Sequence, residues 1–347
     1  MITSNGQLKE LCSELEQGNT IGIDTEFKRV NTYFPELCLI QLAFNNNFYI
    51  IDPLSIDDFR PLVDLFPNND ITWVFHSAEQ DLEALYQKFN KTPHRIFDTQ
   101  IAANFLNFKY QISYQSIVEE IFNVFLEKKF TRIDWSTRPL KSGPEEYAID
   151  DVRYLLGLKK ELDSLLKEQS KLSIVYDEFS EVFSKKNYEI NIFDSWKKLK
   201  GFSKLNKKNI KFAFALAAWR ESLAIKFNKP RRWILKDEKI IEIVMNRASL
   251  EPKHRVDFDK FYQVNNSMFS ELNFNTNRYI LNKSEQSVKV KIQSSLHTLS
   301  KQYNLKNEVL FNKKMLIKFI KLGQKANSVS GWRYSLLKKE LLKWETF

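Results

Sequence analysis

The 347-residue sequence predicts an α/β domain with a mixed β-sheet, followed by a second part made entirely of helices. Three observations lead to this prediction. Strand-like runs dominate the first 53 residues, strand and helix patterns then alternate to about residue 100, and the pattern beyond is helical almost to the end. The chain is also longer than the ~250–300 residues at which a single hydrophobic core stops growing.

The expected elements of the first part follow in order. Residues 7–17 have a helical pattern, and three strands of a meander follow, at 20–27, 37–44 and 47–53. Residues 59–66 have a helical period and residues 72–76 read as a buried strand. Ser77 and Gln80 then have the spacing of a capping box, which predicts that Ser77 is the N-cap of the next helix.

The later elements are expected to be helices. Pro144 favours the start of one long helix over 145–168, and a polar stretch at 184–190 reads as a linker. The basic turn at 228–233 separates two further helices, and a last helical segment is expected over about 308–346. The predicted domains are therefore residues 1–190, 191–289 and 290–347.

Charge is distributed unevenly along the chain. Residues 1–169 carry 17 Lys and Arg against 26 Asp and Glu, a net charge of −9, while residues 170–347 carry +19. A basic half favours a polyanionic partner bound through its phosphates. A general bias of the sequence toward Lys and Asn explains the same count, so the two interpretations stay open together.

Several classes of protein are disfavoured. No stretch approaches the ~20 apolar residues of a membrane-spanning helix, and the N-terminal residues lack a signal-peptide pattern. Cys12 and Cys38 fit neither a disulfide framework nor a zinc site. These features predict a cytoplasmic location with no membrane partner, and nothing in the sequence implies an obligate protein partner.

Asp24 and Glu26 end the first expected strand. Because side chains alternate along a strand, the two carboxylates leave the same face. Carboxylates at this spacing can share a hard cation such as Mg²⁺ or Mn²⁺. The alternative is a pair of solvated edge residues, although a strand that is apolar at Ile21 and Ile23 is not expected to end in two acids without a partner.

Two further elements offer acidic side chains. Asp81 lies in the first turn of the helix after strand 72–76, where α/β folds gather their sites, although a favourable charge near a helix N-terminus is an equal explanation. Tyr147 and Asp151 are four residues apart and share a helix face, whereas Asp150 points about 100° away. Carboxylates from three separate elements form the set that a two-metal nuclease needs.

Several segments resemble a known family. IDTEF (23–27), HSAEQDLEAL (76–85) and YAIDDVRYL (147–155) resemble the three motifs of the DEDD exonuclease superfamily, the last in its Tyr-x-x-x-Asp form. FDTQIAANFL (97–106) and LEKKFTRIDWSTRPL (126–140) narrow the resemblance to the ribonuclease D family. Residues 216–244 are similar to the helicase-and-ribonuclease-D C-terminal (HRDC) domain, with a weaker second copy over about 290–347.

The resemblance implies a ribonuclease-H-like exonuclease fold followed by HRDC-type helical domains. It implies 3′-to-5′ hydrolysis of RNA with two divalent ions, Mg²⁺ or Mn²⁺. The family's metal-binding carboxylates fall on Asp24, Glu26, Asp81 and Asp151, and its catalytic tyrosine falls on Tyr147. The implied partner is RNA with a single-stranded 3′ end, in particular transfer-RNA precursors. Lys28 departs from the family, where this position is usually apolar.

Contacts to RNA are also expected outside the acidic cluster. Phe27 and Tyr33 are candidates for stacking on bases, and basic side chains are candidates for phosphate contacts: Lys204, Lys207, Lys208, Arg231 and Arg232. For each of these residues, packing in the core or on a solvated helix face is the alternative. Two other functions stay open, a 3′-to-5′ DNA exonuclease with the same chemistry and an inactive RNA-binding protein.

Overall fold

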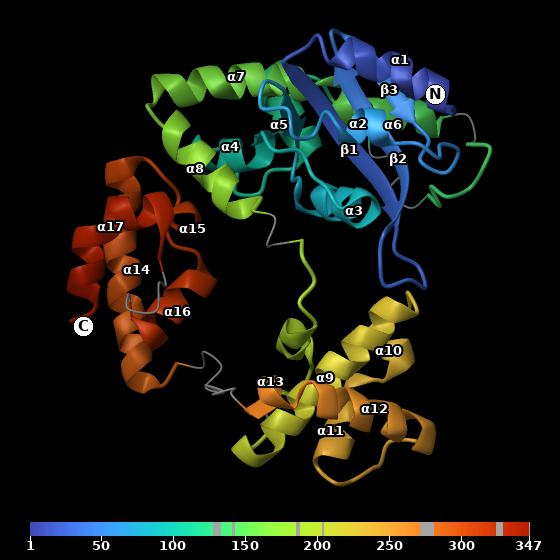
Figure 1. The fold of residues 1–347 in the computed structure, drawn as a ribbon. Coiled ribbons are helices and arrows are strands. Elements are labelled where there is room, and N and C mark those ends of the chain that lie inside the picture. Colours follow the sequence, from blue (N-terminus) through green and yellow to red (C-terminus); the bar gives the residue numbers. More distant parts are fainter. Residues whose placement is uncertain are drawn as a thin grey trace. The chain divides into compact units, whose positions relative to one another are not determined.

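The computed structural model describes residues 1–127, 133–140, 143–184, 188–202, 205–270, 281–323 and 329–346. Lys204 lies outside the described residues, and so do the side chains of Lys207 and Lys208. The chain divides into two compact units (Figure 1). The larger unit contains residues 1–28, 36–188 and 281–347, and the smaller unit contains residues 29–35 and 189–280.

A five-stranded mixed sheet is the centre of the larger unit. Its strands lie in the order β3-β2-β1-β4-β5. The first three form an antiparallel meander, while β4 is parallel to β1 and β5 is parallel to β4. The bounds are β1 (Thr20–Lys28), β2 (Glu36–Phe44), β3 (Asn47–Ile51), β4 (Thr72–Phe75) and β5 (Ile96–Asp98).

β1 is paired unequally on its two sides. Its pairing with β2 continues from Gly22 to Lys28, with an irregularity between Glu26 and Phe27. Its pairing with β4 covers only the first three residues, Thr20 to Gly22. Beyond Gly22, the edge of β1 that faces away from β2 is therefore not paired with β4, and a helix can approach it there.

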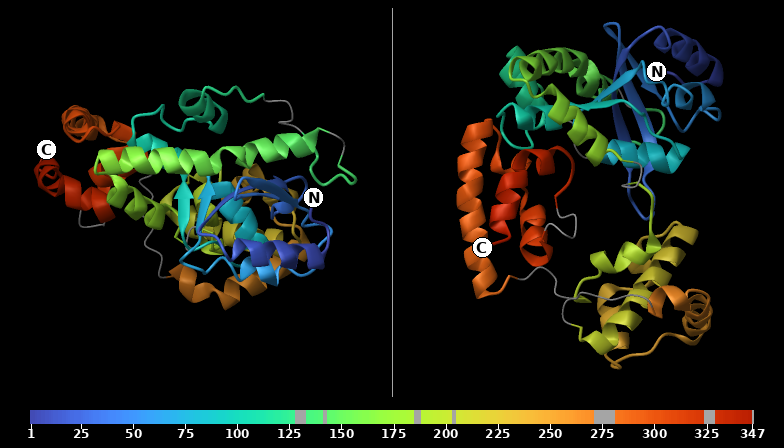
Figure 2. Two further views of the ribbon diagram at one scale, coloured as in Figure 1. Left: turned by 90° about the horizontal axis from the view of Figure 1, so that it is seen from above. Right: turned by 60° about the vertical axis from the view of Figure 1, so that its left-hand side comes forward.

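Helices cover both faces of the sheet, with a hydrophobic core on each side. One face is covered by α1 (Asn5–Leu15), α2 (Arg60–Val63) and α3 (Glu79–Phe89). The other is covered by α4 (Thr99–Phe105), α5 (Tyr114–Phe122), α6 (Pro144–Arg153), α7 (Leu155–Glu168) and α8 (Leu172–Val182). The view from above shows the row of α6 and α7 on one side of the strands and α1 on the other (Figure 2, left).

The smaller unit is helical. Its core surrounds α9, whose Phe214 and Trp219 pack with Phe258 and Phe269. Arg220 of α9 and Asp237 of α11 form a buried ion pair. The elements are a 3₁₀ helix (Ile192–Lys198), α9 (Lys207–Lys226), α10 (Arg231–Ile234), α11 (Asp237–Val244), α12 (Pro252–Val264) and α13 (Asn266–Ser270).

The last segment of the chain packs against α4 and α8 of the larger unit. Arg333 on α17 donates two hydrogen bonds to the Glu178 carboxylate on α8 and a third to the carbonyl oxygen of Val309. Buried Lys171 donates to the carbonyl oxygens of Phe105 and Asn304. The segment comprises α14 (Lys283–Tyr303), α15 (Asn307–Leu310), α16 (Lys313–Leu322) and α17 (Gly331–Trp344).

The predicted fold class is confirmed, a mixed sheet flanked by helices with an all-helical part after it. No helix in the described residues is long and apolar enough to cross a membrane. The expected domain boundary at 289–290 falls inside α14, and the compact units divide at 280–281 instead. Pairing of Lys171 and Glu178 with the last segment accounts for that division.

Two local predictions are wrong. Ser77 has a left-handed backbone, and α3 begins after Ala78 with no side-chain cap. The Asp98 carboxylate accepts from the Ala78 N–H just before α3, but the helix that Asp98 caps is α4. The single helix expected over 145–168 is broken at Tyr154, whose N–H donates to the Tyr114 hydroxyl.

We expect Arg333→Met to lower the stability of the larger unit by about 3–5 kcal/mol, because the largely buried Glu178 carboxylate loses its cationic partner and keeps only the Trp332 N–H. Lys343→Met on the same helix is the matched control, since its pair with Glu340 is largely exposed and worth about 0–1 kcal/mol. Thermal unfolding of both variants measures the difference. Equal melting temperatures would contradict the role given to Arg333.

Candidate metal centre and active site

β1 presents Asp24 and Glu26 on the sheet face that α6 covers. Ile21 and Ile23 are fully buried in the core on the opposite face, so strand alternation turns the two acids the other way. The pairing of β1 with β2 shifts only after Glu26, where Cys38 on β2 is the extra residue. Both acids therefore lie in the regular part of the strand and keep a common direction.

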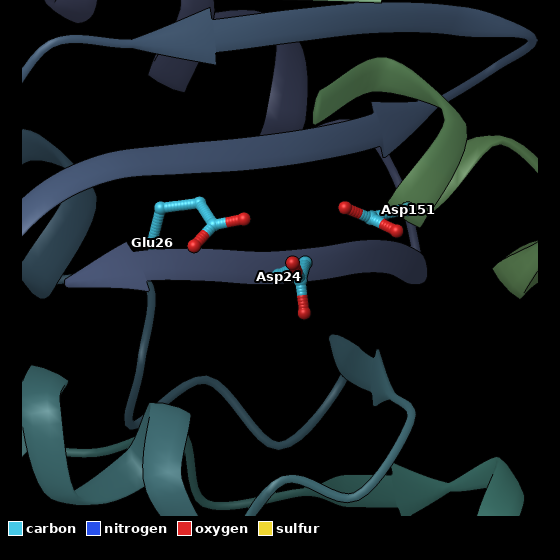
Figure 3. Close-up of side chains that lie close together, drawn as sticks. All are labelled: Asp24, Glu26 and Asp151. Carbon is cyan, nitrogen blue, oxygen red and sulfur yellow. The ribbon is translucent and has the colours of Figure 1, made fainter. Parts of the chain in front are cut away.

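α6 brings a third carboxylate to the same place. Asp24, Glu26 and Asp151 each contribute one carboxylate oxygen, and these three oxygens all lie within 4.8 Å of one another. In Figure 3, Asp24 and Glu26 stand on one strand and Asp151 reaches toward them from the neighbouring helix. Asp150 points elsewhere and accepts a hydrogen bond from Arg153. The predicted choice of Asp151 over Asp150 agrees with this geometry.

Asp81 approaches β1 from the side that β4 leaves open. It is buried in the first turn of α3, and its carboxylate accepts a hydrogen bond of 2.5 Å from the Thr25 hydroxyl. Its negative charge raises the pKa values of Asp24, Glu26 and Asp151. Asp81 is therefore electrostatically part of the cluster, although its carboxylate is turned toward Thr25.

Burial and mutual repulsion make the ionised cluster unfavourable. Burial is the main cause that raises the pKa of Asp24 well above its ordinary range, and the charges of Asp81, Asp151 and Glu26 add to it. The same two causes raise the pKa of Glu26 to about 8 and that of Asp151 to about 7. Burial raises the pKa of Asp81 to about 7. Carboxylate oxygens crowded in this way are suitable ligands for a hard divalent cation, which offsets their charge.

Tyr147 lies one helical turn before Asp151 on α6. Its ring stacks on Trp135, with ring centroids 6.4 Å apart and planes inclined by 23°. Burial is the main cause that raises the pKa of its hydroxyl to about 12, and the charges of Asp151, Glu26 and Asp24 contribute. At neutral pH the tyrosine is therefore a protonated hydroxyl beside the carboxylates.

The loop that carries Trp135 is held at two points. Lys28 donates to Asp134 (2.7 Å) and to Ser136 (2.9 Å), the residues on either side of Trp135. Three residues after Trp135, Arg138 forms a two-pronged ion pair with buried Asp52, with both distances 2.7 Å. Lys28 thus ties the end of β1 to this loop.

Sequence reasoning gave this loop no role, although it marked the segment as typical of the family. Arg138 also donates to the carbonyl oxygens of Trp135 and Cys38. The contacts of Arg138 with Cys38 and Asp52 join residues 100 and 86 positions apart, which no local pattern indicates. The signal that was available is the density of charged and aromatic residues in IDWSTRPL (133–140).

Four of the residues expected to contact RNA make contacts within the protein in this structure. Phe27 packs against the core of the larger unit. The Tyr33 hydroxyl donates to Glu221 within the smaller unit, and the backbone N–H groups of Tyr33 and Phe34 donate to Asn228. Arg231 and Arg232 lie near Glu221 and Glu238, at 3.5 and 3.4 Å. Phe27 thus packs in a core and Tyr33 is hydrogen-bonded in this structure, and stacking of either ring on a base stays a prediction.

Comparison with known proteins places this arrangement in a family. The model of the 3′-5′ exonuclease family matches residues 1–167. The chain is 37% identical to a ribonuclease D of Bartonella henselae over 267 residues, 76% of this chain and 64% of that protein. It is 36% identical to a ribonuclease D of Desulfotalea psychrophila over 251 residues, 72% of this chain and 67% of that protein. The aligned part thus spans just under two thirds of the first relative's length.

A solved structure has the same fold over almost the whole chain. The crystal structure of Escherichia coli RNase D matches with a TM-score of 0.87 at 24% identity, covering 99% of this chain and 97% of that one. At this identity the match supports the fold alone. It extends through both the mixed sheet and the helical part.

We expect Asp151→Asn to stabilise the metal-free protein at pH 8 but not at pH 4. An acid whose pKa is about 7 in the folded state and near 4 in the unfolded state loses stability as pH rises from about 4 to about 7. The variant lacks this loss, so its melting temperature in EDTA should exceed that of the wild type by a few degrees at pH 8.

Asp64→Asn is the control for this experiment, because Asp64 is exposed and pairs with exposed Lys91. It should leave the pH profile of the melting temperature unchanged. A melting temperature of Asp151→Asn below that of the wild type at pH 8 would show that the carboxylate cluster does not strain the fold.

Proposed function

This chain belongs to the ribonuclease D family, and on that basis we propose that it is a 3′-to-5′ exoribonuclease. It removes nucleoside 5′-monophosphates one at a time from the 3′ end of RNA. The observation that supports this most is the crowding of three half-buried carboxylates from β1 and α6, with the buried Asp81 of α3 close enough to raise their pKa values. A protein that only bound RNA would gain nothing from negative charge beside a phosphodiester.

Asp24, Glu26, Asp81 and Asp151 would hold two divalent cations, Mg²⁺ or Mn²⁺. When bound, these cations lower the pKa of the attacking water and offset the charge on the leaving 3′ oxygen. Water attacks the terminal phosphorus, the bond from phosphorus to the 3′ oxygen breaks, and that oxygen takes up a proton. Asp81 accepts from the Thr25 hydroxyl in this structure, so its side chain would have to turn away from Thr25 to hold a cation with the other acids.

Tyr147 would orient the attacking water through its hydroxyl. A phenol whose pKa is about 12 is too weakly acidic to be ionised and to serve as a base at neutral pH. It can still donate or accept a hydrogen bond at a fixed position. Trp135 holds the ring of Tyr147, and the anchors at Lys28 and Arg138 hold Trp135. The loop thereby supports the proposed geometry.

The basic second half would supply affinity for the RNA backbone. Residues 170–347 carry a net charge of +19, which favours phosphate contacts. Arg231 and Arg232 lie on the short helix α10, on which Trp233 is 59% exposed, and we keep the two arginines, with Lys204, Lys207 and Lys208, as proposed contacts. We further propose that residues 191–289 and 290–347 correspond to HRDC-type domains, with the structural division nearer 280.

Transfer-RNA precursors, in the cytoplasm, are the proposed substrate.

A degradation assay tests the activity. Wild-type protein with Mg²⁺ or Mn²⁺ should release mononucleotides from a transfer RNA with extra 3′ residues, and EDTA should stop the reaction. Alanine at Asp24, Glu26, Asp81 or Asp151 should each slow turnover by about 10³-fold or more, because several kcal/mol of charge stabilisation are lost. Faster cleavage of single-stranded DNA than of RNA would favour a DNA exonuclease, and no cleavage of either would favour an inactive binding protein.

Tyr147→Phe tests the proposed role of the hydroxyl. We expect kcat to fall by about 10²-fold while the KM for a short RNA and the affinity for Mn²⁺ stay near wild type, because only one hydrogen-bonding group is removed. The ring still stacks on Trp135, so the melting temperature should hardly change. An equal loss of RNA affinity and of rate would assign Tyr147 to substrate binding instead.

A further inference from the structure

Gln41 is a buried polar residue for which the fold offers no evident use. Its side chain in β2 is completely buried, and neither its amide oxygen nor its amide nitrogen has a hydrogen-bond partner among the described residues. A buried amide without a partner lowers the stability of a folded chain, whereas an apolar side chain of similar size would not. Its presence in the run from Leu37 to Phe44, where every other residue is apolar, therefore indicates a role outside packing.

The register of the sheet gives Gln41 a particular neighbour. Gln41 is the cross-strand partner of Asp24 on β1 and of Ile50 on β3. Residues directly opposite in an antiparallel pair have side chains on the same face, with Cβ atoms about 4.5–5.5 Å apart. Of these two neighbours only Asp24 has a polar side chain. The amide of Gln41 is thus within one side-chain rotation of the Asp24 carboxylate.

The surroundings of Gln41 leave few other polar partners. Along β2, the neighbours on the same face are Leu39, opposite Glu26, and Ala43, opposite Gly22. Leu39 and Ile50 pack with Ala148 of α6, the helix that carries Asp151. Gln41 is therefore a polar residue among apolar neighbours on the sheet face that α6 covers, and it lies next to Asp24.

We propose that Gln41 is a positioning residue for the metal centre, whose side-chain N–H donates a hydrogen bond to the Asp24 carboxylate when the acids hold their cations. This inference rests on the proposed function. In the present arrangement Asp24 accepts from the backbone of Thr25 and is repelled by three carboxylates. An amide donor fixes the direction of the carboxylate oxygens without adding another charge. Such support of a metal ligand typically affects metal affinity by 10–100-fold.

The proposal predicts opposite effects on stability and on metal binding. Gln41→Leu removes an unpartnered polar group, so the metal-free protein should melt at a higher temperature than the wild type. Its affinity for Mn²⁺, measured by titration calorimetry, should fall by about 10–100-fold. At saturating Mn²⁺, kcat should be reduced while the KM for a short RNA stays the same, because Gln41 is not proposed to touch RNA. Gln41→Met, closer in length, should behave alike and replaces Gln41→Leu if that variant does not fold.

Asn104→Leu is the matched control, because Asn104 is a buried amide whose oxygen accepts from the Gln111 N–H. It should lower the melting temperature and leave the affinity for Mn²⁺ unchanged. Wild-type affinity and wild-type kcat in both Gln41 variants would overturn the inference while leaving the proposed function intact. If the wild type itself binds neither Mn²⁺ nor Mg²⁺, the proposed function falls and the inference about Gln41 falls with it.

Discussion

Repulsion among four crowded carboxylates, one buried and three half-buried, is the constraint that the rest of this structure accommodates. Asp24, Glu26 and Asp151 offer oxygens within 4.8 Å of one another, and Asp81 adds a fourth charge. Such a cluster opposes folding unless rigid elements hold it. β1 holds two of the acids on the sheet. α6, which carries Asp151, is held against the sheet by Ala148, which packs in the core, and by Tyr147, whose ring stacks on Trp135. The ion pair of Arg138 with Asp52 belongs to the same support.

The features that could be predicted are those that depend on local geometry. Alternation along a strand and the 3.6-residue period of a helix were enough to pair Asp24 with Glu26 and to select Asp151 over Asp150. The break at Tyr154 could not be predicted, because the apolar period continues through Leu155 and Leu158 and the cause is a hydrogen bond to Tyr114, 40 residues away. Gln41 looks unremarkable until the register of β2 places it opposite Asp24.

Long-range contacts also decide how the helical half is organised. Charge and composition indicated a basic region after the catalytic domain, with boundaries drawn at polar stretches. The structure instead joins the last segment to the larger unit, through Lys171 and through Glu178 with Arg333. These partners are more than 130 residues apart, and each residue alone has the appearance of an ordinary surface charge. The last helices thus pack against α4 and α8, which cover the sheet, and they also contribute to the positive charge of the second half.

The regular alternation of β1 limits where this part of the chain can change in length. A shift of one residue in a strand turns every later side chain to the opposite face. The extra residue in the β1–β2 pairing is Cys38 on β2, so β1 itself alternates without a break through both acids. An insertion or deletion in the segment between β1 and β2 leaves the carboxylates where they are. The same change between Thr20 and Glu26 would turn one or both acids into the core of the opposite face, so this short stretch tolerates substitution far better than it tolerates a change in length.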